Sequence, residues 1–277
     1  MVKNKKGNVV LTVLFTLISL LWIFPIVEVV LNSFKRKAYI SREPFGLPTG
    51  KMFEGLKNYI NGIEKTDFFR AFGLSLLVTV LSVAVLLLCT SMCAWYIVRV
   101  KSVISSVMFY GFVFSMIVPF QMVMFTLSKI ANMLRLTTPL GLVLVYLGFG
   151  AGLCVFMFTG FVQSIPLEIE ESAMIDGCNP IQAYFRIVLP IMKPTCITVA
   201  ILEAMWIWND YLLPILVLDS DYQTIPIAIQ YLKGGHGSVD MGAMMATLVL
   251  SIIPIVIFYM LCQKYIIEGV VAGAVKG

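Results

Sequence analysis

Four carboxylates gather in one short polar stretch of the chain, between two long apolar segments. They are Glu168, Glu170, Glu171 and Asp176. Pro166 precedes them and suits the first turn of a helix, where its missing N–H costs nothing. Carboxylates that follow such a start favour the positive end of the helix dipole. Gly177 then predicts the end of this helix, because glycine adopts positive φ without strain.

A second short helix is predicted directly after this turn. Asn179 is a good N-cap and Pro180 suits the first helical position, whereas Pro190 predicts the end of the helix. Apolar residues recur at three- and four-residue spacing in both halves, which gives each helix one apolar stripe. The stripes are Ile165, Ile169, Ala173 and Met174 in the first half and Ile181, Tyr184, Phe185 and Val188 in the second. Residues 163–194 therefore predict an amphipathic hairpin.

Such a hairpin has two interpretations. A helix that lies in the lipid headgroup region favours Lys and Arg on its polar face. The polar face of the first helix is acidic here, and anionic lipid would repel it. The sequence therefore favours a hairpin that docks into a groove on another protein.

The remaining reactive residue types stand alone. His236 is the only histidine, and the six cysteines form no CxxC pair, so no metal site is predicted. No pair of catalytic residue types stands at a motif spacing inside an apolar segment, so we do not expect an enzyme. The chain also has no G-x-x-x-x-G-K-[ST] sequence, so any ATP hydrolysis coupled to it would take place in a separate subunit.

Two carboxylates lie inside an apolar segment, where a charge is costly and usually functional. Glu203 is the deeper one, and Asp210 follows about two turns later on the same predicted helix. An aromatic face beside amide or carboxylate groups can hold a sugar. The candidates for such a translocation path are Glu203, Trp206, Asn209 and Asp210. The alternatives are a structural hydrogen bond for the glutamate and interfacial anchoring for the tryptophan.

The composition requires a bilayer around the elements that position these residues. Apolar residues make up 60% of the 277 and charged residues 13%, which is far more apolar surface than one soluble core buries. Lys and Arg lie between the apolar runs, so the net charge of +5 does not indicate nucleic-acid binding. Six runs are long enough to span about 30 Å of hydrocarbon as helices. They are residues 9–31, 72–98, 103–127, 139–162, 195–217 and 241–263.

Charge alone does not fix the orientation. An even number of spans puts both termini on one side, and calling that side cytoplasmic leaves nine Lys and Arg inside against eleven outside. The positive-inside rule therefore leans slightly the other way, because residues 32–71 carry eight of the eleven.

The polar hairpin resembles the EAA loop of ABC importer permeases. That motif reads E-A-A, three residues, G, nine residues, I, any residue, L-P. Six of its seven fixed positions match, and a serine replaces the first alanine. The matching stretch contains Glu171, Ser172, Ala173, Gly177, Ile187, Leu189 and Pro190. The spacing match over twenty residues is specific.

Further segments resemble the maltose-type, six-span subunit of the carbohydrate importers, and the resemblance covers nearly the whole chain. These segments are Ser33-Phe34-Lys35, Leu56-Lys57-Asn58-Tyr59, Trp208-Asn209-Asp210 with Pro214, and the C-terminal stretch 268–277. The resemblance implies an all-α, type I permease fold as one domain over 1–277. It also implies a location in the cytoplasmic membrane with both termini in the cytoplasm.

The resemblance also implies partners and sites. Loop 163–194 would be cytoplasmic and would couple to a dimeric ATPase that binds ATP and Mg, with Glu170 and Asp176 beside the motif in that contact. A second homologous permease chain and an extracytoplasmic sugar-binding protein would complete the transporter. Loops 32–71 and 218–240 would be extracytoplasmic. Loop 218–240 would contact the binding protein through Gly234, Gly235, His236 and Gly237.

Two alternatives stay open from the sequence. The EAA loop is shared across substrates, so the solute could be something other than a sugar. An ion-coupled secondary transporter would use Glu203 as an ion or proton site, although the chain lacks the internal repeat common in that class.

Overall fold

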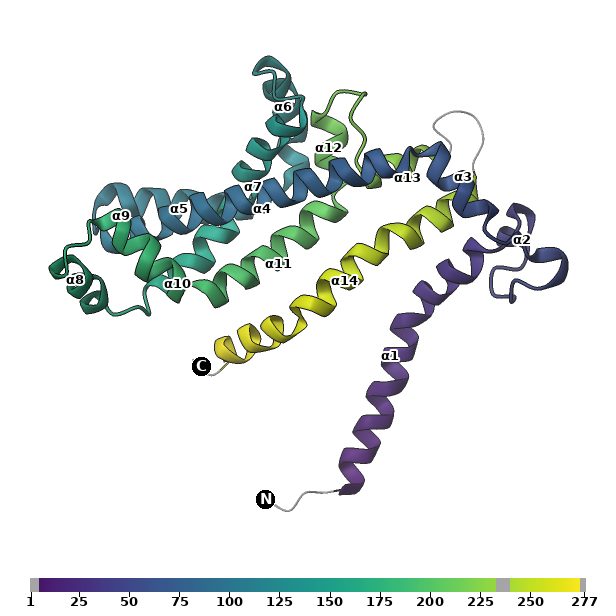
Figure 1. The fold of residues 1–277 in the computed structure, drawn as a ribbon, viewed down its shortest axis with the longest axis horizontal. Coiled ribbons are helices and arrows are strands. Elements are labelled where there is room, and N and C mark those ends of the chain that lie inside the picture. Colours follow the sequence, from purple (N-terminus) through teal and green to yellow (C-terminus); the bar gives the residue numbers. More distant parts are fainter. Residues whose placement is uncertain (1–4, 233–239, 275–277) are drawn as a thin grey trace. The chain divides into compact units, whose positions relative to one another are not determined.

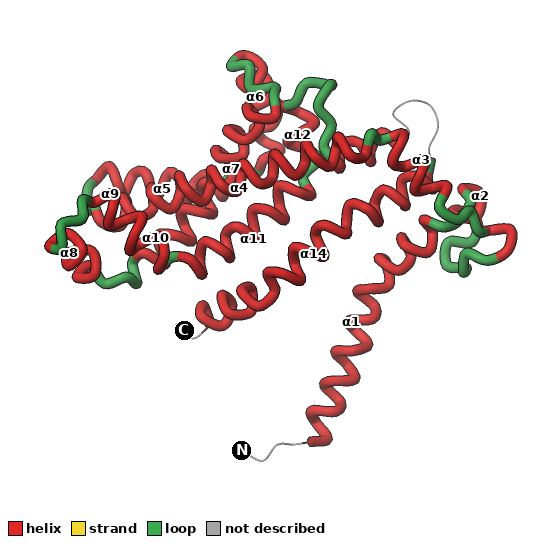
Figure 2. Tube along the Cα trace, viewed as in Figure 1, coloured by secondary structure: helices red, strands yellow, loops and turns green. Residues whose placement is uncertain are grey.

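The computed structural model describes residues 5–232 and 240–274, with their side chains from residue 9 to residue 265. Within these ranges the chain forms helices joined by turns and loops (Figure 2), apart from one isolated β-bridge between Lys35 and Phe53. The all-α prediction is confirmed.

The long helices carry the apolar runs, and short helices fill the loops between them. The long helices are α1 (Lys5–Ser33), α4 (Phe68–Arg99), α5 (Val103–Ile117), α6 (Phe120–Met133), α7 (Pro139–Val162), α11 (Lys193–Asn209) and α14 (Met241–Ala274). The short ones are α2 (Lys37–Arg42), η1 (Gly50–Met52), α3 (Lys57–Lys65), α8 (Leu167–Ile175), α9 (Pro180–Ala183), η2 (Tyr184–Val188), α10 (Leu189–Ile191), α12 (Leu212–Val217) and α13 (Ile225–Leu232).

Four of the six predicted spans are single helices long and apolar enough to cross a membrane. They are Val9–Ser33, Phe68–Arg99, Pro139–Val162 and Met241–Tyr265. Pro25 and Pro254 lie inside α1 and α14 without ending them. The 139–162 prediction coincides with α7.

The prediction of one continuous span over 103–127 is wrong. The chain bends by 107° between Val103–Ile117 and Phe120–Met133. Val118 is extended, with φ −73° and ψ 115°, because the ring of Pro119 disfavours helical geometry in the residue before it. The segment 103–133 is thus at most one broken span.

The predicted span over 195–217 is also interrupted. Helix α11 ends at Asn209, Asp210 is extended with ψ 123°, and α12 begins only at Leu212. A second bend, of 74°, separates Pro180–Ile191 from Lys193–Asn209. Residues 180–209 therefore form the other broken span.

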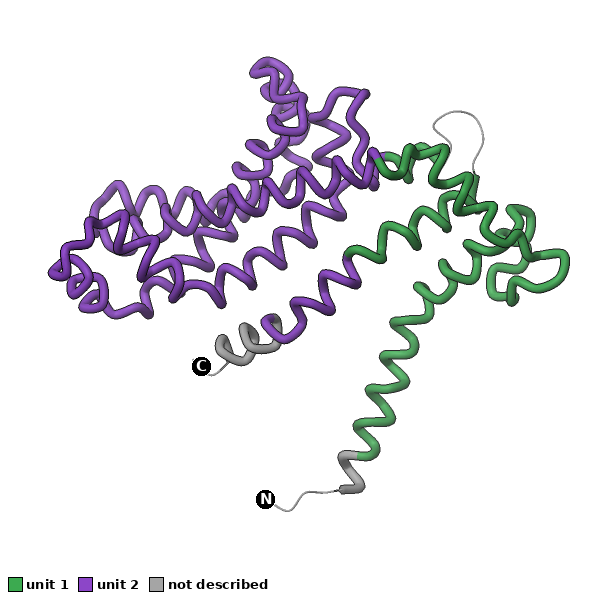
Figure 3. The backbone as a smooth tube through the Cα atoms, viewed as in Figure 1, with its two compact units in different colours: residues 1–69, 228–254 green, residues 70–227, 255–277 purple. Residues whose placement is uncertain are grey.

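The chain divides into two compact units (Figure 3). Unit 1 comprises residues 1–69 and 228–254, and unit 2 comprises residues 70–227 and 255–277. That the whole chain acts as one permease domain stays a prediction.

Unit 2 contains α5, α6, α7, α11 and α12 and most of α4 (Figure 1). Helix α7 is the most buried of its long helices. The apolar core of unit 2 joins α4, α7 and α11, and contains Leu86, Tyr146, Val155, Phe158 and Val199, all at most 1% exposed. This core gives the hairpin at 163–194 a rigid support.

Unit 1 contains a buried cation. Lys35 is 0% exposed, and its Nζ donates to Asn32 Oδ1 at 3.0 Å and to the carbonyl oxygens of Glu43 at 2.9 Å and Pro44 at 2.6 Å. Burial of a charge is costly unless its hydrogen bonds are replaced. Three oxygens replace them here, so Lys35 fixes the loop after α1.

In contrast, α1 is exposed on every side within unit 1. Its apolar side chains from Val9 to Val27 all face outward, including Trp22, which is 77% exposed. A helix that is apolar all round requires lipid or another protein around it.

Candidate functional site

The predicted hairpin at 163–194 is confirmed as two short helices joined at Gly177. Helix α8 has Glu168 and Glu170 in its first turn, with Pro166 one position earlier than predicted, at the N-cap. Gly177 has φ +90°, the left-handed region in which only glycine is unstrained. A Cβ added to it would meet nothing within 4 Å.

The second helix begins as the sequence predicts. Asn179 and Gln182 form a capping box, in which Asn179 Oδ1 accepts from the Gln182 N–H at 2.9 Å and Gln182 Oε1 accepts from the Asn179 N–H at 3.0 Å. Pro180 occupies the first helical position. These local contacts define the turn between the helices.

The prediction that Pro190 ends this helix is wrong. Pro190 lies inside α10, and the helical chain continues until the bend at Met192. Residues Tyr184–Val188 form a π-helical turn, in which the Leu189 N–H bonds to the Tyr184 carbonyl. This wider turn changes the hydrogen-bond register just before a residue that has no N–H, so the proline is accommodated rather than breaking the helix.

Glu170 anchors the hairpin to the end of α4. It is 2% exposed. Its Oε1 lies 2.7 Å from Arg99 Nη2 and accepts a hydrogen bond from Arg99 Nε at 2.9 Å. Its Oε2 accepts from Trp95 Nε1 at 2.8 Å. Arg99 Nη2 also donates to the carbonyl of Ile165 at 2.9 Å, just before α8. The carboxylate that the sequence assigned to a partner contact is therefore used inside the chain.

Tyr184 makes a second contact with the same face of α4. The residue is 0% exposed, its hydroxyl lies 2.6 Å from Ser91 Oγ, and its ring packs against Trp95 with centroids 5.2 Å apart. Ser91, Trp95 and Arg99 follow one another at four-residue spacing and so share one face of α4. We call these five residues, Ser91, Trp95, Arg99, Glu170 and Tyr184, the α4 anchor.

The other face of α8 is exposed. Glu168, Glu171, Ser172 and Asp176 face outward, and Ile175 is 86% exposed at the tip. Of the remaining motif residues, Ala173 is buried, Ile187 and Leu189 are half-buried and Pro190 is exposed.

The predicted apolar stripe of α8 does not face the core as a whole. Ile165 and Ala173 are buried, but Ile169 is 39% and Met174 43% exposed. The buried ion pair of Glu170 sets the rotation of the helix instead, because it places that carboxylate inward. The exposed surface of α8 is thus part acidic and part apolar.

The intramembrane candidates separate into two groups. Glu203 is 3% exposed against α7, where its Oε1 accepts from Cys154 Sγ at 3.3 Å. Its Oε2 is buried without a hydrogen-bond partner among the described residues. The burial of Glu203 favours the structural alternative, and its place on a translocation path stays a prediction. Trp206, by comparison, is 41% exposed, and Asn209 is exposed with its Nδ2 bonded to the Met205 carbonyl at 2.7 Å.

Asp210 holds the break between α11 and α12. Its Oδ1 accepts from the N–H groups of Leu212 at 3.0 Å and Leu213 at 3.3 Å, and its Oδ2 accepts from the Tyr146 hydroxyl at 3.0 Å. The Tyr146 ring packs edge-on against Trp206, with centroids 5.4 Å apart. Asp210 therefore positions Trp206 through Tyr146.

Some predicted positions cannot be placed. Gly234, Gly235, His236 and Gly237 lie outside the described residues. Among the residues that are described, no group of three or more His, Cys, Asp or Glu could hold a metal ion.

The α4 half of the anchor and Tyr146 were not predicted from the sequence. A signal existed for the first, because Ser91, Trp95 and Arg99 stand four residues apart at the end of an apolar run. Tyr146 and Cys154 likewise stand eight residues apart on α7, on the face that meets Glu203 of α11 and Asp210 just after α11. Polar or aromatic residues at multiples of four within an apolar run were the available indication.

Comparisons with known proteins agree with this geometry. The family model described as the binding-protein-dependent transport system inner membrane component matches residues 87–271. The chain is 39% identical to the probable starch degradation products transport system permease protein AmyC of Thermoanaerobacterium thermosulfurigenes, over 96% of both chains. It is 33% identical to the multiple sugar-binding transport system permease protein MsmG of Streptococcus mutans, over 95% of both chains.

A solved structure shares the fold. It is described as a bacterial ABC transporter involved in the import of the acidic polysaccharide alginate, and one of its chains matches with a TM-score of 0.79 at 21% identity, over 96% of this chain and 98% of that one. The fold is that of an ABC importer permease.

The chain belongs to the family of binding-protein-dependent transport system inner membrane components. It is a multi-pass inner membrane transport subunit and not an enzyme. Family membership places it in a transporter complex with an ATPase and a binding protein.

Proposed function

We propose that this chain is the permease subunit of an ATP-driven sugar importer, that it forms half of the translocation pore, and that hairpin 163–194 couples it to the ATPase. The relatives support a sugar, since their names refer to starch degradation products, multiple sugars and arabinooligosaccharides. The observation that carries the coupling role is the α4 anchor. It ties α8 rigidly to a membrane-spanning helix while it leaves Glu171, Asp176 and Ile175 exposed.

The proposed assembly has four kinds of chain. This subunit pairs with a second homologous permease subunit, and a dimeric ATPase binds ATP and Mg and grips the hairpin on the cytoplasmic side. A sugar-binding protein docks on the opposite side, where loops 32–71 and 218–240 lie, and both termini are cytoplasmic. No nucleic acid takes part, and the bilayer surrounds the exposed apolar helices.

The motif residues divide between two roles in this proposal. Glu171, Ser172, Asp176 and Gly177 meet the ATPase, because they are exposed. Ala173 is buried and Ile187 and Leu189 are half-buried, so they support the hairpin from within this chain, and Pro190 lies in α10, between the π-helical turn and α11. Glu170 is a positioning residue that holds α8 in place. Movement of the ATPase would therefore reach α4 through Glu170 and α11 through residues 184–192.

Substitution of Gly177 tests the coupling role. Gly177→Ala and Gly177→Leu both cost about 1–2 kcal/mol of backbone strain, and a Cβ at this position meets no atom of this chain within 4 Å. Any difference between the two variants therefore reports on a partner surface. We expect Leu to lower ATPase activity stimulated by the binding protein, and uptake into reconstituted vesicles, about tenfold more than Ala.

Gly177→Asn is the matched control, because asparagine tolerates positive φ better than other residues yet still adds bulk. If the coupling role is correct, Asn resembles Leu in uptake despite its smaller strain. Equal activity of the Leu and Ala variants would show that no partner contacts Gly177.

Trp206 is the best candidate for sugar contact within this chain. It is exposed, Asn209 lies exposed beside it on α11, and Asp210 fixes its orientation through Tyr146. Trp206→Ala is expected to raise the KM for uptake or slow it several-fold, with binding-protein affinity unchanged. Trp206→Phe, which keeps an aromatic face, is expected to retain most transport. Normal uptake by Trp206→Ala would remove this residue from the path.

A further inference from the structure

Unit 1 carries a polar groove of about 700 Å³ just beyond the end of α1. Its lining is rich in charge: it includes Arg36, Lys37, Lys57 and Lys65 as cations and Glu54 and Asp240 as anions. Two positive charges are therefore in excess. The side chains of Arg36, Lys57 and Lys65 are 58%, 68% and 51% exposed, so the cations are accessible from outside.

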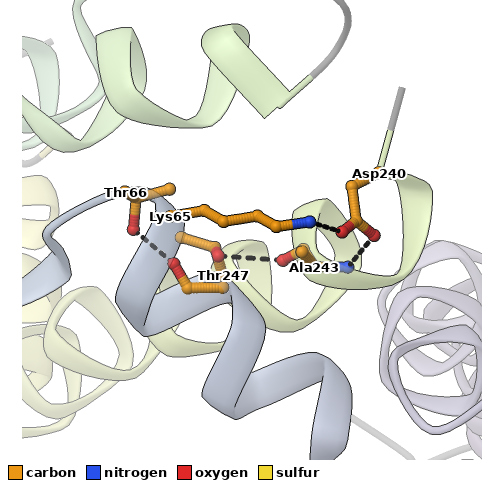
Figure 4. Close-up of polar contacts among 6 residues, drawn as sticks. Lys65, Thr66, Asp240, Ala243 and Thr247 are labelled. Carbon is orange, nitrogen blue, oxygen red and sulfur yellow. Dashed lines mark hydrogen bonds and ion pairs between the residues drawn. The ribbon is translucent and has the colours of Figure 1, made fainter. Parts of the chain in front are cut away.

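The two carboxylates are each held by cations of the groove. Glu54 lies 2.8 Å from Arg36 Nε and 3.3 Å from Lys57 Nζ. Asp240 pairs with Lys65 and also accepts from the Ala243 N–H at 3.1 Å, at the start of α14 (Figure 4). Lys37 is exposed and makes no side-chain hydrogen bond or ion pair within the part of the chain that the structure describes. The groove thus keeps a free cation at its edge.

Buried contacts hold the backbone that forms the groove. Asn58 is 6% exposed, and its Nδ2 donates to the carbonyls of Ser33 and Lys35, both at 2.8 Å, which fixes the backbone next to Arg36. One turn further along the same face of α3, Gly62 allows close contact with α14, since a Cβ there would lie 2.6 Å from Thr247 Oγ1. A prearranged set of charges binds a complementary partner with little ordering cost.

All four cations of the groove lie within residues 32–71, the segment whose positive charge conflicts with the positive-inside rule. Residues 32–71 hold eight Lys and Arg, and the positive-inside rule disfavours such an excess on the side where the proposed orientation puts them. A functional need for positive charge at that surface explains the excess. Arg36, Lys37, Lys57 and Lys65 supply half of it in one groove.

We propose that this groove is the docking site for an acidic surface of the extracytoplasmic binding protein. Asp and Glu side chains of that protein would pair with Lys37 and with Lys57 and Lys65, in competition with Glu54 and Asp240. The inference rests on the proposed orientation. It favours a protein partner over anionic lipid because the strong negative surface potential of membranes belongs to the cytoplasmic leaflet, and because the family depends on a binding protein.

The experiment uses the whole transporter in nanodiscs of phosphatidylcholine, with the purified binding protein that accompanies it in native membranes. The affinity of the binding protein for the transporter is measured at about 50 mM and 300 mM salt. The double variant Lys37→Glu/Lys57→Glu is expected to weaken binding at low salt about tenfold or more and to flatten the salt dependence. Lys51→Glu is the matched control. It makes one of the same charge reversals in the same loop but outside the groove, and it is expected to change the affinity less than twofold.

Asp240→Asn is a control for misfolding, because it is expected to strengthen binding and a misfolded variant would not. Asparagine still caps α14, but it releases Lys65 and removes a competing anion, so binding is expected to become two- to fivefold tighter at low salt. The inference is overturned if the double variant binds like the wild type, if Lys51→Glu weakens binding equally, or if Asp240→Asn fails to strengthen it. The same measurement is repeated in nanodiscs that contain anionic lipid, and an effect of the double variant that appears only there would assign the groove to lipid instead. If the groove variants behave as expected but the Gly177 variants do not, only the proposed coupling of the hairpin to the ATPase is overturned.

Discussion

Two regions of this molecule bury a charge, and they do so in opposite ways. Glu170 in unit 2 meets a full counter-charge from Arg99 together with the indole N–H of Trp95. Lys35 in unit 1 meets only neutral oxygens, from the Asn32 side chain and the carbonyls of Glu43 and Pro44. The first contact joins two helices far apart in sequence, and the second folds one loop upon itself. Both side chains of an ion pair can be substituted together, whereas no substitution removes a backbone carbonyl.

The largest effect is expected from breaking the ion pair. Glu170→Ala leaves the partly buried Arg99 guanidinium, whose side chain is 17% exposed, without its counter-ion, which costs up to about 3–5 kcal/mol. We expect a lower Tm of the purified transporter and loss of coupled ATPase activity. The double variant Glu170→Met/Arg99→Met should recover most of the Tm, since apolar replacements of a buried pair are often neutral. If the double variant is no more stable than the single one, the pair is not the unit of stability.

Replacement of Lys35, the buried cation of unit 1, should lower the stability less than Glu170→Ala does. No second substitution is expected to restore the lost stability. Lys35→Met leaves buried oxygens without a donor, at about 1–3 kcal/mol. Because two of these oxygens belong to the backbone, no second substitution removes them. The Tm of Lys35→Met, compared with exposed Lys51→Met, measures this effect. A Tm within one degree of the control would show that water replaces the lysine.

A smaller effect is expected at the second contact of the α4 anchor. Tyr184→Phe removes one hydrogen bond to Ser91, worth about 0.5–1.5 kcal/mol, and keeps the ring against Trp95. Ser91→Ala removes the same bond from the other side. In a double-mutant cycle on Tm the two changes should be less than additive, and full additivity would show that the hydroxyls do not interact.

The smallest effect concerns the ion pair between Lys65 and Asp240 on the surface of unit 1, and it depends on pH. Burial opposes ionisation of Asp240, but the hydrogen bonds from Lys65 and Ala243 and the charges of Lys65 and Lys37 outweigh it, so its pKa lies below the ordinary 3.8. The pair therefore stabilises the fold at neutral pH and loses this contribution as the pH falls below about 4.

For an exposed pair the contribution is about 1 kcal/mol or less. The Tm difference between the wild type and Asp240→Asn should be constant from pH 7 to about pH 5 and should shrink toward pH 3. A difference that grows as the pH falls would contradict this assignment.

Local chemistry was enough to predict much of the hairpin. The turn at Gly177, the cap at Asn179 and the start at Pro180 depend on neighbours a few residues away, and each is found as expected. The prediction that Pro190 ends its helix failed because the π-helical turn before it accommodates the proline. The missed breaks at Val118 and Asp210 share another cause. Apolar composition marks a segment as membrane-embedded, but it does not say whether the backbone bends there.

The sequence by itself determined that the chain spans a membrane and carries an acidic hairpin, because hydropathy and turn chemistry are local properties. Only the tertiary structure decided which carboxylates are free. Glu170 and Glu171 are adjacent and chemically alike, yet one is buried against Arg99 and the other faces outward. That choice depends on a residue about seventy positions away, brought near by the packing of α4 against the core.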